Sequence, residues 1–318
     1  MNQVELSRVV ISTWDVGNAS VEHIQTGVDG NQTFHVTDGA SRGILRVYGE
    51  QGRNHPDWVR FELELLVHLA DAGVSVAAPI VTRDGSLLKI IDDRPAALFE
   101  FAGGDVEWPT EPSLAGLLGA SFAEMHCAAN TYITSAGNRS LDTDSLLLTP
   151  LAMMRKYLED SNADDNSAWA TLADTASQCA NLLEAIPDAQ GTVGPIHGDL
   201  HQGNCHFDVH KLTIFDFSNA AVGWRVYDLS GFLWPFRDDT ILDPAIRAAC
   251  DAFLEGYNNV RPLQQAERMA IAASVKARDF WETGNWLQFG DNLDAQDVRF
   301  SLRRLADRFR KHPISATV

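Results

Sequence analysis

Residues 196–210 read IHGDLHQGNCHFDVH and hold the side chains best suited to chemistry in this chain. Asp199 and Asn204 lie five positions apart, and a second carboxylate, Asp216, follows the strand-like run LTIF. Phosphoryl transfer needs an aspartate that orients the attacking hydroxyl and accepts its proton, together with oxygen ligands for Mg²⁺. These three side chains are of the required types. The alternative is a polar loop stabilised by aspartate and asparagine.

The same spacing occurs in the catalytic loop of protein kinases, which reads H-R-D-x-x-x-x-N and is followed by a metal-binding aspartate in D-F-G. In this chain HGD at 197–199 stands in place of H-R-D, and DFS at 216–218 stands in place of D-F-G. Glycines within the loop allow the backbone to turn tightly and to approach a ligand. The second acid and the segment upstream favour phosphoryl transfer over a simple polar loop.

A zinc site is a rival interpretation, because four histidines fall in the same segment: His197, His201, His206 and His210. Histidines four apart suit ligation from a helix. However, glycines interrupt the first pair, and HFDVHKLTIF is typical of a strand hairpin. In a strand the second pair would lie roughly 13 Å apart, at about 3.3 Å per residue. We therefore expect His206 and His210 at ordinary surface positions and His201 in a loop near the substrate.

A serine nucleophile is a second rival, because GASRG at 39–43 matches the G-x-S-x-G elbow. That motif exposes its serine on a strained turn from a strand into a helix. Here a strand-like run, ILRVYG, follows Ser41, and the preceding residues indicate a hairpin. We interpret the match as accidental.

The acidic balance of the chain limits its partners. The formal net charge is −18 over 318 residues, whereas a nucleic-acid-binding face is basic. We expect no nucleic-acid partner and a solvated acidic surface, with an acidic cleft for a cationic substrate as the alternative. No apolar run approaches the roughly 20 residues of a membrane span, and the N-terminal segment lacks the layout of a secretory signal. These features predict a cytoplasmic protein without a membrane partner and leave its oligomeric state open.

The four cysteines are widely spaced and form no C-x-x-C pair, which predicts free thiols in a cytosolic protein. Cys127 and Cys179 fall in apolar helical patterns, so we expect both in the core. The polar run DDNSA at 164–168 is expected as an exposed turn.

The order of the predicted elements indicates an α+β fold with two lobes. Residues 1–102 alternate strand-like runs with turns, and we expect a mixed sheet carrying one helix near 57–73, which would bind the nucleotide. Residues 103–318 are mostly helical in pattern, apart from a short β segment, and would hold the catalytic loop and the acceptor site. No internal repeat is evident.

The N-terminal segment supplies residues that could hold a nucleotide. Gly27, Gly30 and Asn31 fall in a turn between two strand-like runs, where a loop could cover phosphates, although most such turns are only hairpins. Arg46 lies on the following strand, and Glu62 lies in the next helix with Glu64 as a nearby competitor. A basic residue on the third strand, paired with a helix glutamate, holds the phosphates in kinases.

With these motifs in view, the chain resembles the aminoglycoside phosphotransferase and choline kinase-like enzymes, which have a protein-kinase-like fold. The resemblance covers nearly the whole chain and rests on ILRVYG at 44–49, ALFEFAGG at 97–104, FAEMH at 122–126, HGDLHQGN at 197–204 and FDFSNAAVGWRVYDLS at 215–230. GYNNVRPL at 256–263 is most similar to the branch that holds type II homoserine kinases, hydroxylysine kinase and a bacterial stress-response protein kinase.

The resemblance implies roles for individual residues, with ATP and Mg²⁺ as cofactors. Asp199 would be the catalytic base, Asn204 and Asp216 the Mg²⁺ ligands, Arg46 the phosphate contact and Glu62 its partner. The adenine would meet the backbone near Glu100 and Ala102, and Asp228 would be a buried carboxylate that holds the catalytic loop. In two places the chain departs from many relatives, which have lysine where Arg46 stands and a second acid where Ser218 stands. Arginine keeps the charge but changes the geometry.

The sequence therefore predicts an ATP- and Mg²⁺-dependent phosphotransferase acting on a hydroxyl of a small molecule: an amino alcohol, a hydroxy amino acid such as homoserine, or an aminoglycoside-like compound. A protein Ser/Thr kinase and a nucleotide-binding pseudokinase are the alternatives. The acceptor residues are not determined. Acidic residues would suit an amino alcohol, and arginines would suit an acceptor with a carboxylate. The scattered candidates are Arg237, Asp238, Asp239, Arg278, Asp279, Trp281 and Trp286, with an amphipathic helix core as the favoured interpretation of 278–281.

Overall fold

A computed structural model of the chain describes residues 2–27, 30–39, 41–49, 54–108, 111–134, 137–159, 162–188, 191–208, 211–237, 243–290 and 292–314. The chain divides into two compact units. Unit 1 comprises Met1–Glu107, Thr131–Arg139 and Gly203–Ala221, and unit 2 comprises Trp108–Asn130, Ser140–Gln202 and Val222–Val318. None of the helices in the described ranges has the length and hydrophobicity that a membrane span requires.

Unit 1 is built on an antiparallel sheet. Its strands are β1 Ser20–Thr26, β2 Gln32–Asp38, β3 Ser41–Val47, β4 Pro79–Ile80, β5 Lys89–Ile91 and β6 Arg94–Glu100. The order is β1-β2-β3-β6-β4, with β5 also paired to β6. Every described pair in this sheet is antiparallel, so the expectation of a mixed sheet was wrong. Strands β1, β2 and β3 are neighbours in chain order, and β6 pairs antiparallel with the other edge of β3.

Helix α2, Pro56–Asp71, is the helix that the sequence predicted in this unit. Proline in its first turn suits the helix start because that position needs no backbone N–H. Its apolar positions Val59, Phe61, Leu65 and Leu69 are all buried, as the periodicity indicated.

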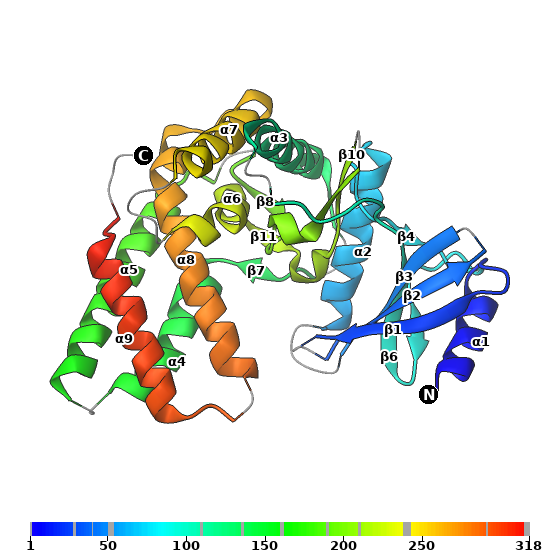
Figure 1. The fold of residues 1–318 in the computed structure, drawn as a ribbon, viewed down its shortest axis with the longest axis horizontal. Helices are drawn as coiled ribbons and strands as arrows, with labels where there is room; N and C mark the ends of the chain where they lie inside the picture. The colour runs from blue at the N-terminus through cyan, green and yellow to red at the C-terminus, as the bar shows by residue number, and fades with distance from the viewer. Residues whose placement is uncertain are drawn as a thin grey trace. The chain divides into compact units, whose positions relative to one another are not determined.

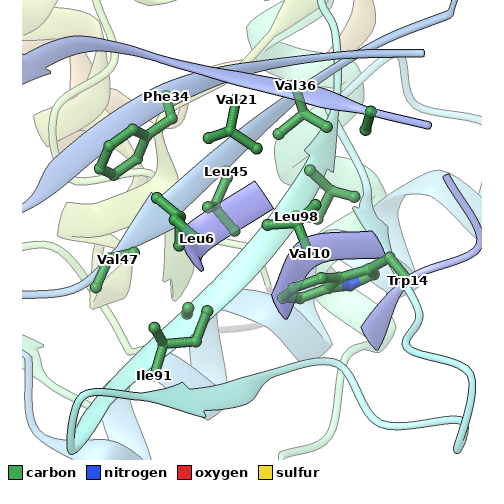
Figure 2. Close-up of a cluster of buried hydrophobic side chains, with 12 residues drawn as sticks. Leu6, Val10, Trp14, Val21, Phe34, Val36, Leu45, Val47, Ile91 and Leu98 are labelled. Carbon is green, nitrogen blue, oxygen red and sulfur yellow. The ribbon is translucent and has the colours of Figure 1, made fainter. Parts of the chain in front are cut away.

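A further helix, α1 (Gln3–Thr13), was not anticipated. Asn2 and Glu5 form a capping box at its start, which satisfies backbone N–H groups that the first turn leaves free. Figure 2 shows side chains of α1 packed against one face of the sheet. The buried set includes Leu6, Val10 and Trp14 from α1 and just beyond it, with Val21, Val36, Leu45 and Leu98 from the strands.

A second hairpin in unit 1 carries two of the predicted site residues at its open end. Its strands are β9, Cys205–Asp208, and β10, Lys211–Ile214, which pair antiparallel with Cys205 opposite Ile214. The short turns η3, Gln202–Asn204, and η4, Phe217–Asn219, flank this hairpin.

Unit 2 is mostly helical. Its helices are α3 Pro112–Ala128, α4 Thr149–Leu158, α5 Ala163–Glu184, α6 Arg225–Leu233, α7 Pro244–Val260, α8 Gln265–Phe289 and α9 Ala295–Lys311, with short turns at Ala129–Thr131, Asp144–Leu148 and Trp234–Phe236. The small sheet β7-β11-β8 comprises Ser140–Leu141, Ala221–Trp224 and Val193–Ile196. Helices α3 and α7 lie side by side (Figure 1), and their backbones approach closely because Gly119 meets the carbonyl of Phe253.

Two local expectations in unit 2 were wrong. Residues 164–168 form the first turn of α5 and are not an exposed turn, because Asp165 is buried and accepts a hydrogen bond from Arg303 Nε at 2.6 Å. Cys179 is buried as expected, but Cys127 is exposed. Cys127 lies on the solvent-exposed face of α3.

Candidate active site

Arg46 is the centre of the predicted nucleotide site in unit 1. It is 9% exposed on β3 and donates from Nη1 to Glu62 Oε1 at 3.1 Å and from Nη2 to Asp216 Oδ1 at 2.8 Å. Tyr48 Oη donates to the other oxygen of Glu62 at 3.0 Å. Burial alone would lower the pKa of Arg46, but the Asp216 and Glu62 carboxylates outweigh it and raise that pKa, so the group remains cationic.

The structure also distinguishes Glu62 from its competitor. Glu64 Oε2 accepts a hydrogen bond from Tyr132 Oη at 3.4 Å, whereas Glu62 is 3% exposed and bonded to Arg46. Glu62 and Glu64 are two positions apart on α2 and therefore point in different directions around the helix. The pairing that the sequence left open is thus with Glu62.

The hairpin β9–β10 places Asn204 and Asp216 at the same end. Because Cys205 and Ile214 are register partners, the residues just outside them also meet, and Phe215 N donates to Asn204 O at 3.0 Å. Asp216 follows immediately and has a left-handed backbone, with φ of 64°. A non-glycine residue rarely adopts this conformation, and such strain occurs at functional sites.

Ser218 lies beside the same carboxylate. Its Oγ donates to Asp216 Oδ1 at 2.8 Å, so this oxygen accepts hydrogen bonds from both Ser218 and Arg46. The position where the resemblance implied a second acid thus holds a hydroxyl that donates to Asp216.

The described residues of the predicted phosphate-covering turn, Gly27, Gly30 and Asn31, are joined by backbone hydrogen bonds. Gly27 N donates to Asn31 O at 2.8 Å, and Gly30 N donates to Gly27 O at 2.9 Å. Asn31 is buried, and its Oδ1 accepts from Gly49 N at 2.7 Å, which ties the turn to the chain just after β3. Gly30 has φ of +78°, a conformation that favours glycine. Residues 28 and 29 lie outside the described part.

A pocket of about 280 Å³ lies within unit 1 beside these groups. Arg46 and Asp216 line it together with Glu100 and Ala102, which the sequence predicted as adenine contacts. Four aromatic rings also line it, those of Phe99, Phe101, Phe215 and Phe217. The pocket therefore offers both apolar ring surfaces and charged groups.

His206 is a residue of this pocket that the sequence analysis placed wrongly. It was expected at the surface, but it is half-buried, and its Nδ1 lies 2.7 Å from Ala102 O, to which it donates. Its ring meets Phe215 edge to face, with centroids 4.6 Å apart. Strand β9 runs antiparallel to the segment after Ala102, since Asp105 and Phe207 form a bridge, and this long-range pairing gave no local signal.

The rival sites receive no support from the described residues. Among them no three His, Cys, Asp or Glu side chains gather as a metal group, and His210 lies outside this part of the chain. Ser41 begins β3 and pairs with Asp38 of β2, so it lies in a hairpin and not in a turn from a strand into a helix.

Residues 197–202 of the predicted catalytic loop lie in unit 2, directly after β8. Asp228 in α6 holds it: Oδ2 accepts from His197 N at 2.8 Å, and Oδ1 accepts from Gly198 N at 2.9 Å. His126 Nε2 lies 3.0 Å from Asp228 Oδ2 and donates to it. Burial alone would raise the pKa of Asp228, but these hydrogen bonds and the nearby histidines hold it below its ordinary value. Asp228 thus has the loop-holding contacts that the resemblance implied.

Asp199 lies at the end of this loop. Its backbone N–H donates to His197 Nδ1 at 3.3 Å, so His197 supports the loop from within. Its carboxylate accepts a hydrogen bond from Arg278 Nη2, and His201 Nε2 lies 3.8 Å from the same oxygen, Oδ1. Arg278 comes from α8, 79 positions along the chain, and is 3% exposed.

The other acceptor candidates have different surroundings. Asp279 Oδ1 accepts hydrogen bonds from Trp234 Nε1, Arg237 Nε and Arg308 Nη2 at 2.7–2.9 Å, which joins α8 to its neighbours. Trp281 is 7% exposed and Trp286 is 37% exposed. Asp238 and Asp239 lie outside the described residues. Among the scattered candidates that are described, Arg278 is in contact with Asp199.

Comparison with known proteins identifies the family. Residues 23–263 match the model of the phosphotransferase enzyme family. A homoserine kinase from Xanthobacter autotrophicus is 32% identical over 269 residues, which cover 82% of this chain and 78% of that protein.

Two solved structures share the protein-kinase-like fold. One is an amicoumacin kinase in complex with AMP-PNP, Ca²⁺ and its ligand, with a TM-score of 0.77 and 20% identity, covering 100% of this chain and 96% of that one. The other is a microcompartment-associated aminopropanol kinase, with a TM-score of 0.77 and 22% identity, covering 99% and 100%. The α+β fold class predicted from the sequence is confirmed. This chain belongs to the phosphotransferase enzyme family and is a phosphotransferase that acts on hydroxyl groups.

Proposed function

We propose that this protein transfers the γ-phosphoryl group of ATP to a hydroxyl of a small molecule in the presence of Mg²⁺. The observation that carries the proposal is the Arg46 guanidinium, held between Glu62 and Asp216 in a pocket with aromatic walls. A nucleoside triphosphate combines an apolar base with an anionic triphosphate group. The pocket offers matching surfaces for both.

The residues of unit 1 fit the nucleotide and its metal. Arg46 would contact the phosphates, with Glu62 holding the guanidinium in place, and the backbone at Glu100 and Ala102 would meet the adenine. Asn204 and Asp216 supply the oxygen ligands that Mg²⁺ prefers. Bound Mg²⁺ would neutralise phosphate charge during transfer. The turn containing Gly27, Gly30 and Asn31 lies next to β2 and would cover the phosphates.

Asp199 would act on the acceptor. A bond forms between the acceptor oxygen and the γ-phosphorus while the bond from that phosphorus to the β-γ bridging oxygen breaks, and the hydroxyl proton passes to the Asp199 carboxylate. ADP and the phosphorylated acceptor leave. His197 and Asp228 keep the loop in one conformation, and this positioning supplies much of the catalysis in phosphoryl transfer.

A small-molecule acceptor is supported by the homoserine kinase relative and by the two kinases of the same fold. The test is an acceptor panel read by ADP release and by mass spectrometry of the products. It contains homoserine, choline, hydroxylysine, an aminoglycoside and a model protein, each with ATP and Mg²⁺.

We expect phosphorylation of at least one small alcohol and loss of activity when EDTA removes the metal. Phosphoryl transfer to the model protein and to no small molecule would contradict the proposal and indicate a protein kinase. Nucleotide binding without transfer to any acceptor would identify a pseudokinase.

A further inference from the structure

We propose that Arg278 and Glu282 form a binding site for a zwitterionic acceptor, with the acceptor carboxylate on Arg278 and its ammonium group on Glu282. The acceptor is then a small hydroxy amino acid whose hydroxyl faces Asp199. This inference rests on the proposed function and names the substrate class of the same site.

The first argument concerns the hydrogen bonds of Arg278. Its Nη2 is paired with Asp199 Oδ1 and lies 3.1 Å from Glu282 Oε1. Its Nε and Nη1 are buried and have no hydrogen-bond partner among the residues that the structure describes. Three N–H donors of one cation are thus unsatisfied, and a buried donor without an acceptor is costly. An acceptor oxygen from a ligand would satisfy them.

The second argument concerns charge. Arg278 is in contact with two carboxylates, those of Asp199 and Glu282, and these three groups together carry one net negative charge when all are ionised. A simple anion would be repelled by this cluster, and a simple cation would leave the unsatisfied N–H donors of Arg278 unpaired. A zwitterion satisfies both requirements, because its carboxylate meets the arginine while its ammonium group meets a carboxylate.

The third argument concerns access. The side chain of Arg278 is only 4% exposed, but those of Glu282 and Asp199 are 34% and 23% exposed. A small ligand that displaces water from the two carboxylates reaches the guanidinium that both contact. The cluster is therefore buried enough to strengthen charged hydrogen bonds and open enough for a small molecule.

The fourth argument concerns rigidity. The Arg278 Cζ lies 5.9 Å from the ring centre of Trp234 and 5.8 Å from that of Trp281, distances at which aromatic faces stabilise a cation. The next residue, Asp279, is bound by Trp234 and by two further arginines, which fixes α8 at this point. A recognition side chain held in this way loses little entropy when the ligand binds.

The test compares three acceptors that differ by one charged group. Homoserine carries both groups, 3-amino-1-propanol is homoserine without its carboxylate, and 4-hydroxybutyrate is homoserine without its ammonium group. The kcat/KM of each is measured at saturating ATP and Mg²⁺ for the wild type, for Arg278→Gln and for Glu282→Gln. Arg155→Gln is the matched control, because Arg155 forms the same i,i+4 pair with Glu159 on an exposed face of α4.

We expect the wild type to prefer homoserine over both analogues. Arg278→Gln should lower the homoserine to 3-amino-1-propanol ratio of kcat/KM by about 30- to 100-fold, since the buried charged contact exists only for the carboxylate. Glu282→Gln should lower the homoserine to 4-hydroxybutyrate ratio, by about 10-fold because it is more exposed. Arg155→Gln should leave both ratios unchanged.

The outcomes separate this inference from the proposed function. If Arg278→Gln lowers kcat for all acceptors equally, Arg278 only positions Asp199 and the inference is wrong. If the wild type phosphorylates choline or an aminoglycoside but no amino acid, the inference is wrong while the proposed function stands. If no small molecule is phosphorylated, the proposed function itself fails. Circular dichroism melting of each variant shows that the fold is intact.

Discussion

Arg46 bridges two acids through different nitrogens, with Nη1 3.1 Å from Glu62 Oε1 and Nη2 2.8 Å from Asp216 Oδ1. The planar guanidinium makes these contacts through two separate nitrogens, whereas a lysine ammonium would have to reach both acids from a single nitrogen. The arginine that departs from many relatives therefore does more than retain a positive charge.

Replacement of Arg46 should weaken nucleotide use in a graded way. We predict that Arg46→Lys raises the KM for ATP by about 10-fold and that Arg46→Gln lowers kcat/KM for ATP by about 100-fold or more, because it also leaves two acids without their cation. Steady-state kinetics with varied ATP measure both values. Arg83→Gln, which removes an exposed ion pair with Asp15, is the control. Equal kinetics for Arg46→Gln and the wild type would contradict the nucleotide assignment.

Gly231 in α6 should be essential for the position of the catalytic loop. A Cβ at this residue would lie 1.8 Å from Leu200 O, next to Asp199, so any side chain forces the helix and the loop apart. We predict that Gly231→Ala lowers the free energy of unfolding by about 1–3 kcal/mol and reduces kcat. Urea unfolding and acceptor turnover measure the two effects.

Gly116→Ala in α3 is the matched control for that substitution. Its added Cβ would lie 3.5 Å from the nearest atom, an ordinary contact, and alanine is the better helix former by about 0.5–1 kcal/mol. This variant should be neutral or slightly more stable than the wild type. A Gly231→Ala protein that matched it in stability and activity would show that the loop tolerates displacement.

His126 should make folding sensitive to acid. It donates from Nε2 to Asp228, and its Nδ1 accepts from Tyr257 Oη at 2.7 Å, an arrangement that requires the neutral ring. Burial lowers the pKa of His126 from 6.5 to about 4. The unfolded chain takes up a proton as the pH falls through 6.5, whereas the folded chain does so only near 4, so stability decreases over this window.

Urea unfolding between pH 7.5 and 4.5 tests this linkage. The free energy of unfolding of the wild type should fall by up to about 3 kcal/mol from this histidine, and the slope should become smaller in His126→Gln. His23→Gln is the control, because His23 is exposed. The lowered pKa of Asp228 also makes the fold less stable in acid, but only as the pH falls below 3.8, the ordinary pKa of an aspartate. An unchanged slope in His126→Gln would refute the assignment.

The elements and the local motifs could be predicted from the sequence. The apolar spacing of 57–69 indicated α2, and HFDVHKLTIF at 206–215 was recognised as a strand hairpin, which the structure has at Cys205–Ile214. These features depend on neighbours within a few positions. Periodicity and motif spacing report such neighbours directly.

The features that were missed depend on residues far apart in the chain. His206 bonds to Ala102 across 104 positions, and Arg278 bonds to Asp199 across 79. The sequence around His206 and around Arg278 does not indicate either of these partners. Helix α1 was missed because its buried side chains, Leu6 and Val10, are separated by polar and smaller apolar residues, and its packing on the sheet is a tertiary effect.

The central claim is that Asp199 is the base in phosphoryl transfer to a small-molecule hydroxyl. The most direct test is the rate of transfer from ATP to the best acceptor of the panel, followed by ³¹P NMR, for the wild type and for Asp199→Asn. Asp174→Asn, which changes an exposed aspartate on α5, is the control. We predict that Asp199→Asn lowers kcat by about 10²- to 10⁴-fold while the Kd for ATP stays within about twofold of the wild type. Transfer by Asp199→Asn within about tenfold of the wild-type rate, or roughly 1.4 kcal/mol of barrier, would contradict the claim.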